Sequence, residues 1–274
     1  MTIRQNSIGT RDSAANPPNA RRWLSGLVGA ALLALATPSH AGTVIASFLG
    51  PNPAGGLVQR TILTGPGAPQ INSTQAPERF DMLRTGGTSL ATLVGSGVGT
   101  DFYGFCVEPR QFLASRTATY DLVPLSQGAT NLGGIGAVKA DEITELFGRY
   151  APNLNAPMTS LKAGALQIAI WEIVRELPSN PLDITAGNIS FTGPENPSGM
   201  IALAQSYVQS IDGTGPRAVG LVALDNGIFG DPGTDAGTQD ILVQLQVPEP
   251  ATLSVLALGS LGLAGARMVR RRRR

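Results

Sequence analysis

Two side chains in this sequence have the types needed to form a covalent bond with each other: the thiol of Cys106 and the carboxamide of Gln167. Cys106 is the only cysteine among 274 residues, so no disulfide can form within the chain. Gln167 stands in the apolar run LQIAIWEIV, where an unpaired buried amide would cost about 1–3 kcal/mol. A thiol that attacks the carboxamide carbon and displaces ammonia leaves a thioester, and such a bond would account for both residues.

The elements that carry the two residues can bring them together. Gln167 lies in the strongest helical pattern of the chain, residues 159–176. In the strand pattern 101–107, Cys106 shares a face with Phe102 and Gly104, while Phe105 points the other way. We expect the thiol and the amide to meet in an apolar pocket, where excluded water would slow hydrolysis of the bond. The helix neighbours of Gln167 are Gly164, Ile170, Trp171 and Val174, and we expect the small Gly164 to make room for the cysteine strand.

Taken alone, these residues also fit a simpler interpretation. A lone cysteine is often a small buried hydrophobic residue. A glutamine on an apolar helix face can be satisfied by a nearby backbone carbonyl. Both interpretations remain open at the level of residue chemistry.

The two motifs also resemble a known family, the bacterial surface thioester domains. Phe105-Cys106-Val107-Glu108 is similar to the aromatic-Cys-aliphatic-acidic step of that family, and Gln167-x-Ala169-Ile170-Trp171 is similar to its helix motif. Leu166 stands where the family usually has threonine. The resemblance implies a covalent adhesin, in which a nucleophile of a partner attacks the thioester carbonyl. It implies a cross-link between Cys106 and Gln167, within a pocket that includes Phe105, Glu108, Gly164, Ala169 and Trp171.

The spacing of apolar residues, and the Gly, Pro and Asn residues between the segments, predict an α+β fold. Short β-rich segments separated by Gly, Pro and Asn predict antiparallel strands, and longer amphipathic segments predict inserted helices. We therefore expect a β-rich domain, sandwich or barrel-like, with helices between its strands. In the first expected helix we place Val138, Ile143, Leu146 and Phe147 near one face. The expected strands are 43–49, 57–64, 78–84, 88–94, 101–107, 217–224 and 240–247, and the expected helices are 138–148, 159–176 and 198–211.

The N-terminus has the pattern of a secretory signal peptide. Four arginines precede the apolar run 23–36, and small residues follow, which predicts cleavage after Ala41. We therefore expect residues 1–41 to be a signal peptide and residues 42–246 to form the ectodomain. The apolar run is too short to cross a bilayer comfortably.

The C-terminus, residues 247–274, resembles the PEP-CTERM sorting signal of exopolysaccharide-associated proteins. Pro248, Glu249 and Pro250 precede an apolar stretch over 251–266, which we expect to be a hydrophobic helix. The resemblance implies a transient inner-membrane anchor, a sorting protease that cuts near the Pro-Glu-Pro step, and release to the cell surface or matrix. A permanent anchor without processing is the alternative. A cluster of basic residues would stay on the cytoplasmic side of the membrane: Arg267, Arg270, Arg271, Arg272, Arg273 and Arg274.

Composition excludes several classes of function. Residues 42–250 keep ten of the 20 basic and 18 of the 19 acidic residues, a net charge of −8, which disfavours a nucleic-acid partner. The only histidine, His40, lies in the signal peptide, which excludes His-based catalysis and His-ligated metals in the mature protein. We expect no cofactor, no metal and no enzymatic activity, and we interpret the Asp-rich segment 225–240 as a polar surface loop rather than a calcium site.

The favoured interpretation is an exported surface or matrix protein that attaches covalently to a matrix or surface nucleophile, an amine or a hydroxyl. Amines are the expected acceptors, because the expected mature protein has no histidine to activate a hydroxyl. The alternative is a non-covalent, exopolysaccharide-associated structural or binding module with a buried free cysteine. A secreted hydrolase is disfavoured. Without a histidine, only a glycosidase that uses a pair of carboxylates would be possible.

Overall fold

The computed structural model describes residues 42–52, 57–63, 70–89, 91–95, 101–109, 111, 117–227 and 238–246, all within the expected ectodomain. The expected signal peptide with Ala41 and the C-terminal segment 247–274, with its Pro-Glu-Pro step, hydrophobic stretch and arginines, lie outside these residues. Within the described ranges, no helix is long and apolar enough to cross a membrane.

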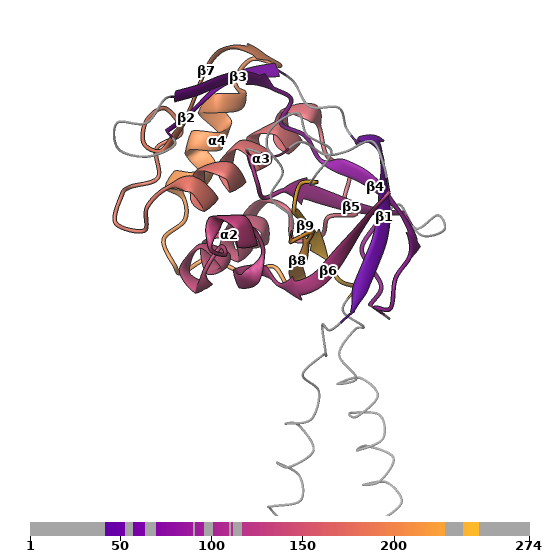
Figure 1. Cartoon of the computed structure of the whole chain (residues 1–274). Coiled ribbons are helices and arrows are strands. Elements are labelled where there is room, and N and C mark those ends of the chain that lie inside the picture. The colour runs from indigo at the N-terminus through magenta and orange to yellow at the C-terminus, as the bar shows by residue number, and fades with distance from the viewer. Residues whose placement is uncertain are drawn as a thin grey trace, which may run out of the picture. The chain divides into compact units, whose positions relative to one another are not determined.

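Six strands close into an antiparallel barrel (Figure 1). The barrel closes because β1 pairs with both β4 and β6, so neither of its edges is left open. The prediction of a β-rich, barrel-like domain with antiparallel strands is confirmed. In barrel order the strands are β1 (Thr43–Pro51), β4 (Phe80–Gly86), β5 (Asp101–Cys106), β9 (Ile241–Gln244), β8 (Leu221–Asp225) and β6 (Ala118–Pro124).

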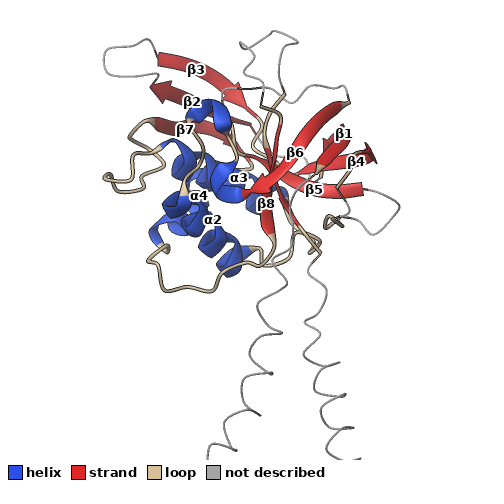
Figure 2. Ribbon diagram, turned by 60° about the horizontal axis from the view of Figure 1, so that its bottom comes forward, coloured by secondary structure: helices blue, strands red, loops and turns tan. Residues whose placement is uncertain are grey.

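A second, three-stranded sheet and three helices complete the part of the chain that the structure describes. The sheet has the order β3 (Gln70–Gln75), β2 (Leu57–Leu63) and β7 (Ile189–Asn196), all antiparallel. The helices are α2 (Ala137–Tyr150), α3 (Ser160–Arg175) and α4 (Met200–Gln209), close to the three predicted ranges. Helix α3 contacts both β5 of the barrel and β7 of the small sheet, and it lies between the two sheets (Figures 1 and 2).

Helix α3 is the central element of the core. Its start is fixed by Thr159, whose hydroxyl accepts a hydrogen bond of 3.2 Å from the Lys162 backbone N–H. Every residue from Ala163 to Val174 is buried, including Gln167. A helix that is buried on all sides requires cover on all sides. The barrel, the small sheet and α4 supply that cover.

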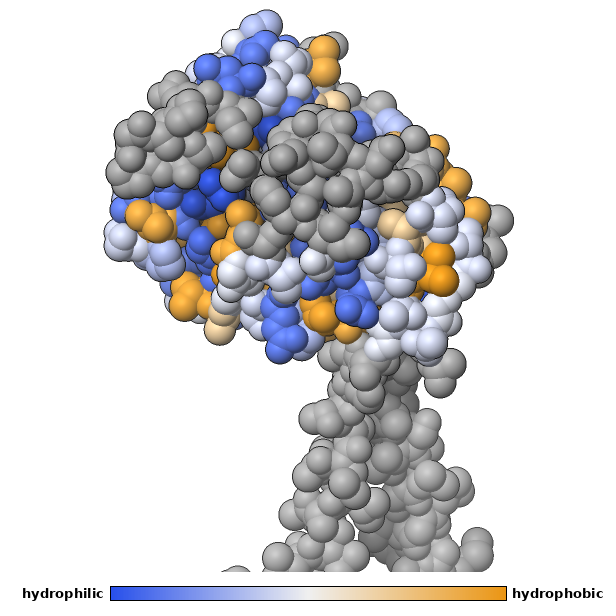
Figure 3. Space-filling model, viewed as in Figure 1, coloured by the Kyte–Doolittle hydropathy of each residue, from blue (hydrophilic) through white to orange (hydrophobic). Residues whose placement is uncertain are grey.

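The surface lacks a broad apolar face in the view of Figure 3. Among the residues described there, exposed apolar side chains lie singly between polar ones. Isolated apolar residues are ordinary on a soluble domain and do not by themselves mark an interface.

Two sequence-based expectations about the elements are wrong. The described residues of the range 88–94, which are all except residue 90, form no strand; among them only Leu93 makes an isolated bridge, to Leu245. The Arg84 guanidinium donates hydrogen bonds to the backbone carbonyls of Ser89 and Ala91. These oxygens are therefore bonded to a side chain and not to a neighbouring strand. Strands β3, β6 and β7 were not anticipated.

The second correction concerns Val138 on α2. Ile143, Leu146 and Phe147 are completely buried as expected, but Val138 is 61 % exposed. At about 100° per residue, Val138 lies about 180° around the helix from Phe147. It therefore faces solvent while Phe147 faces the core.

Candidate functional site

Strand β5 places Cys106 at its last residue, inside the core. Cys106 is opposite Ile241 of β9, and its sulfur is a free thiol with no exposed surface. Gly104 permits the close approach of β9, because a Cβ at this position would collide with the Ile241 side chain. The cysteine is thus held by the barrel wall rather than by a loop.

The structure brings Gln167 against the peptide of Cys106. The Cys106 backbone N–H donates to Gln167 Oε1 at 2.9 Å, and Gln167 Nε2 donates to the Cys106 carbonyl at 2.7 Å. Gln167 is 1 % exposed, so both bonds lie away from water. The amide that the sequence places in an apolar helix therefore has a partner for each of its two polar atoms, and both partners belong to the same cysteine.

The Cys106 sulfur lies in a protected environment that contains hydrogen-bond donors. The Glu108 backbone N–H donates to Sγ at 3.2 Å. Burial raises the pKa of the thiol to about 12, while the Trp171 indole, the Glu108 N–H and the charge of Arg60 act in the opposite direction. In the uncrosslinked form shown here the thiol stays protonated at neutral pH.

The other expected pocket residues are all buried, but they do not all face the cysteine. Phe105 packs edge-to-face on Phe147 of α2, with ring centroids 5.6 Å apart. Trp171 stacks on Phe191 of β7 at 6.1 Å. Glu108 and Ala169 are fully buried.

Gly164 has a different role from the one expected. A Cβ added there would lie 2.5 Å from Met200 Sδ, so the glycine lets α4 approach α3. It does not make room for the cysteine strand. Small residues at a helix crossing commonly serve this purpose, and the sequence alone does not say which neighbour approaches.

One residue near the site was missed by the sequence reasoning. Arg60 of β2 is only 4 % exposed, and its Cζ lies 5.5 Å from the centroid of the Trp171 ring. The sequence signal that could have identified Arg60 is the alternation along β2. Arg60 lies two residues from Val58 and from Ile62, which are both completely buried, so it shares their face of the strand.

The Asp-rich segment 225–240 is only partly a surface loop. Asp225 and Asp240 are 7 % and 2 % exposed, and residues 228–237 lie outside the described residues. Asp240 accepts a hydrogen bond of 2.8 Å from the Asn226 N–H, and Asp225 accepts one of 3.0 Å from the Thr130 hydroxyl. In the part of the chain that the structure describes, no group of three or more His, Cys, Asp or Glu residues is arranged to hold a metal ion.

The buried Asp240 carboxyl predicts a pH dependence of stability. Burial, with the nearby charges of Asp225 and Glu108, raises the pKa of Asp240 to about 8, against the opposing Asn226 hydrogen bond. An aspartate in the unfolded chain ionises at about 3.9, so the folded state holds an extra proton between these values. The resulting stabilisation is complete below about pH 4 and is lost as the pH rises towards 8.

We therefore expect Asp240→Asn to flatten the fall in the free energy of unfolding between pH 5 and 8, a fall whose slope is at most about 1.4 kcal/mol per pH unit. Urea unfolding at several pH values measures this slope. Asp121→Asn, an exposed aspartate on β6, is the matched control and should leave the slope unchanged. An unchanged slope in Asp240→Asn would contradict the assignment.

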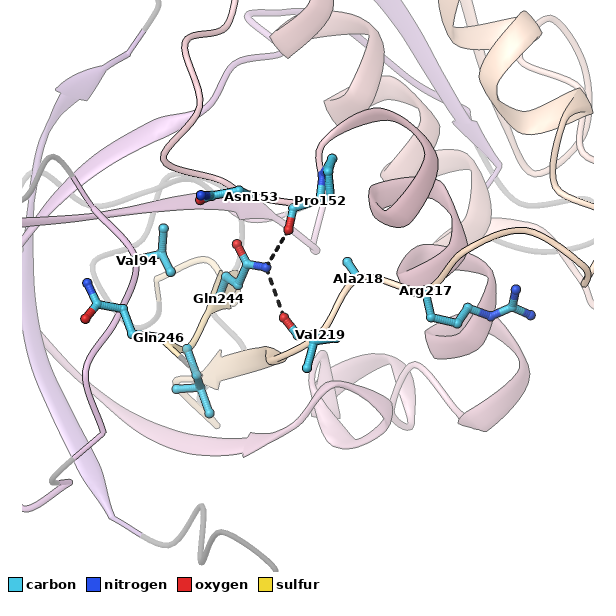
Figure 4. Close-up of a pocket in the computed structure, with 9 residues that line it drawn as sticks. Val94, Pro152, Asn153, Arg217, Ala218, Val219, Gln244 and Gln246 are labelled. Atoms are coloured by element: carbon cyan, nitrogen blue, oxygen red, sulfur yellow. Dashed lines mark hydrogen bonds between the residues drawn. The ribbon is translucent and has the colours of Figure 1, made fainter. Parts of the chain in front are cut away.

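A separate hollow of about 470 Å³ lies beside the end of β9 (Figure 4). Its central polar group is Gln244, whose Nε2 donates to the carbonyls of Pro152 and Val219, both at 2.9 Å, and whose Oε1 accepts from the Leu154 N–H at 2.9 Å. Every polar atom of this amide is paired with backbone, so Gln244 holds loops to the barrel. None of the residues around Cys106 lines this hollow.

The fold and the site define a domain with a buried cysteine–glutamine contact between a barrel strand and a helix. Residues 246–274 match the family described as the PEP-CTERM protein-sorting motif. This motif indicates an exported protein sorted to the surface, with a sorting protease and membrane-associated processing. No curated protein and no solved structure matches the chain.

Proposed function

We propose that the exported ectodomain forms an internal thioester between Cys106 Sγ and Gln167 Cδ, and that it uses this bond to attach covalently to a partner at the cell surface or in the matrix. The observation that carries the proposal is the pairing of both Gln167 amide atoms with the Cys106 peptide. The resemblance of the two motifs to bacterial surface thioester domains supports it independently.

The hydrogen bonds of the Gln167 amide would assist the bond-forming step. As the sulfur attacks Cδ, negative charge develops on Gln167 Oε1, which already accepts a hydrogen bond from the Cys106 N–H. The carbon–nitrogen bond then breaks, and the thiol proton leaves with the amide nitrogen as ammonia. The step needs no external oxidant. The hydrogen bond from Nε2 to the Cys106 carbonyl holds the leaving nitrogen on one side of the carbonyl carbon.

Burial determines when the bond can react. Cys106 and Gln167 are 0 % and 1 % exposed, so bulk water is kept from the thioester. A partner nucleophile reaches Cδ only when the cover opens locally, an event that costs less than global unfolding. The bond is thus stored intact until a partner docks or the domain is opened.

The acceptor is an amine, such as a lysine side chain or an amino sugar. The amine nitrogen attacks Cδ, the carbon–sulfur bond breaks, and a proton from the amine goes to the sulfur. A hydroxyl would need a general base, and the single histidine of the chain lies at residue 40. Each molecule reacts once, so the protein is a covalent binder and not an enzyme.

Methylamine labelling tests the proposal. The protein purified from cells should take up one methylamine, located at Gln167 by peptide mass, with release of the Cys106 thiol. Cys106→Ala should take up none. A lysine-rich peptide should be labelled faster than a neutral polysaccharide. If the wild-type protein takes up no amine, the thioester proposal fails, and faster labelling of the polysaccharide would reject the amine preference.

The C-terminal segment directs the sorting of the domain to the cell surface or matrix. In our proposal the hydrophobic stretch anchors the chain transiently in the inner membrane, the arginines hold its cytoplasmic end, and the sorting protease cuts near Pro248-Glu249-Pro250. A permanent anchor would instead leave residues 251–274 on the purified surface protein. Peptide mapping of the C-terminus distinguishes the two.

A second candidate function is a non-covalent, exopolysaccharide-associated module in which Cys106 is a buried core residue. The same geometry supports it in one respect: the Gln167 amide is fully paired without any covalent bond. A free thiol that titrates fully under native conditions would favour this candidate.

A further inference from the structure

Arg60 is a buried cation whose hydrogen-bonding capacity is mostly unused. It lies on β2, opposite Ser73 of β3 and Phe191 of β7. Its Nη2 donates to the Ser73 hydroxyl at 3.1 Å. Its Nε and Nη1 are buried and have no hydrogen-bond partner in the described part of the chain. A buried charge with two unpaired donors is costly, which suggests a role that needs the charge.

A second donor lies beside it. Trp171 follows Gln167 by one helical turn, and its buried indole Nε1 has no hydrogen-bond partner among the described residues other than the Cys106 thiol. The Arg60 guanidinium lies over the ring of this tryptophan at 5.5 Å. The charge of Arg60 lowers the pKa of the Cys106 thiol, and the indole also lowers it. Donors from two elements, β2 and α3, thus act on the Cys106 sulfur.

The contrast with Arg79 shows that this arrangement is not a general property of buried arginines here. Arg79 is also 4 % exposed and lies over an aromatic ring, that of Tyr103, at 3.9 Å. Its guanidinium, however, donates to the carbonyls of Asn52, Leu154 and Ala156. Arg79 therefore ties loops together, whereas Arg60 leaves its donors available.

We propose that Arg60, supported by the Trp171 indole, stabilises the negative charge on the Cys106 sulfur when the thioester opens. This inference rests on the proposed thioester. When an amine attacks Gln167 Cδ, the electron pair of the carbon–sulfur bond goes to the sulfur, which carries a negative charge until it receives the amine proton. Arg60 keeps its own proton throughout and acts through its charge.

Three Arg60 variants test the proposal by the rate of methylamine opening, followed as release of the Cys106 thiol over a range of pH. Arg60→Gln should slow opening about tenfold to a hundredfold. Arg60→Lys keeps the charge and should restore most of the rate. Arg60→Met replaces the charge with apolar atoms and should fold at least as stably as the wild type, yet open as slowly as Arg60→Gln.

Arg79→Gln is the matched control: it should melt at a lower temperature but open at the wild-type rate when folded. The inference is overturned if Arg60→Gln and Arg60→Met open at the wild-type rate with the wild-type pH dependence, or if Arg60→Lys is as slow as they are. Failure of the underlying thioester has a different signature, since the wild-type protein itself would then take up no methylamine.

Discussion

A variant in which Gln167 is replaced by alanine is expected to be about 3 kcal/mol less stable than one in which Cys106 is replaced by alanine. Neither variant can form a thioester, so the difference compares the loss of the Gln167 amide with the loss of the Cys106 sulfur, which accepts one hydrogen bond from the Glu108 N–H. Gln167→Ala leaves the buried N–H and C=O of Cys106 without partners, whereas Cys106→Ala keeps both hydrogen bonds. For a domain of this size the difference corresponds to about 6–12 °C in melting temperature.

Thermal melts of the two variants, measured side by side, check this expectation. Equal melting temperatures would mean that the amide does not hold α3 to β5. The gap between the wild type and Cys106→Ala carries separate information. The 61 residues that separate Cys106 from Gln167 would form a closed loop in the thioester form. On the chain-entropy account of disulfides, such a loop stabilises by about 4 kcal/mol.

The second large effect is expected on α2. Phe147→Ala should lower the free energy of unfolding by about 4 kcal/mol, because it removes a completely buried ring and its edge-to-face contact with Phe105. Val138→Ala on the same helix is the matched control. With 61 % of its surface exposed, Val138 should contribute no more than about 0.5 kcal/mol.

Urea unfolding of both variants gives these free energies. The account of the core would be wrong if the two substitutions cost the same, or if Val138→Ala were the more damaging. The pair also tests the packing behind the cysteine strand, since Phe105 immediately precedes Cys106 in β5.

The elements that could be predicted from sequence are those whose pattern reflects burial. Strand β5 and helix α3 are rich in apolar residues because both are enclosed, and their ranges were close to those observed. Strand β3, QINSTQ, is polar, and its strand conformation comes from pairing with β2. That pairing is a long-range property, which local composition does not carry. The expected strand 88–94 was wrong for the converse reason, since its carbonyls bond Arg84 instead.

The candidate site was predictable in part. The meeting of Cys106 and Gln167 could be expected because an apolar helix with one amide and a strand with one thiol both had to enter the same core. The reason given for Gly164 was wrong, since its neighbour is Met200 of α4. Arg60 lies far away in the sequence and outside both motifs, so only the alternation of β2 could have pointed to it.

The central claim is that a barrel sulfur and a helix carboxamide are joined in the mature protein. The intact mass of the untreated, purified protein tests it most directly, compared with the mass calculated between its own terminal residues. We predict a deficit of one ammonia in the wild type and no deficit in Cys106→Ala. A wild-type protein of full calculated mass, with a Cys106 thiol that reacts stoichiometrically once the chain is denatured, would contradict the claim.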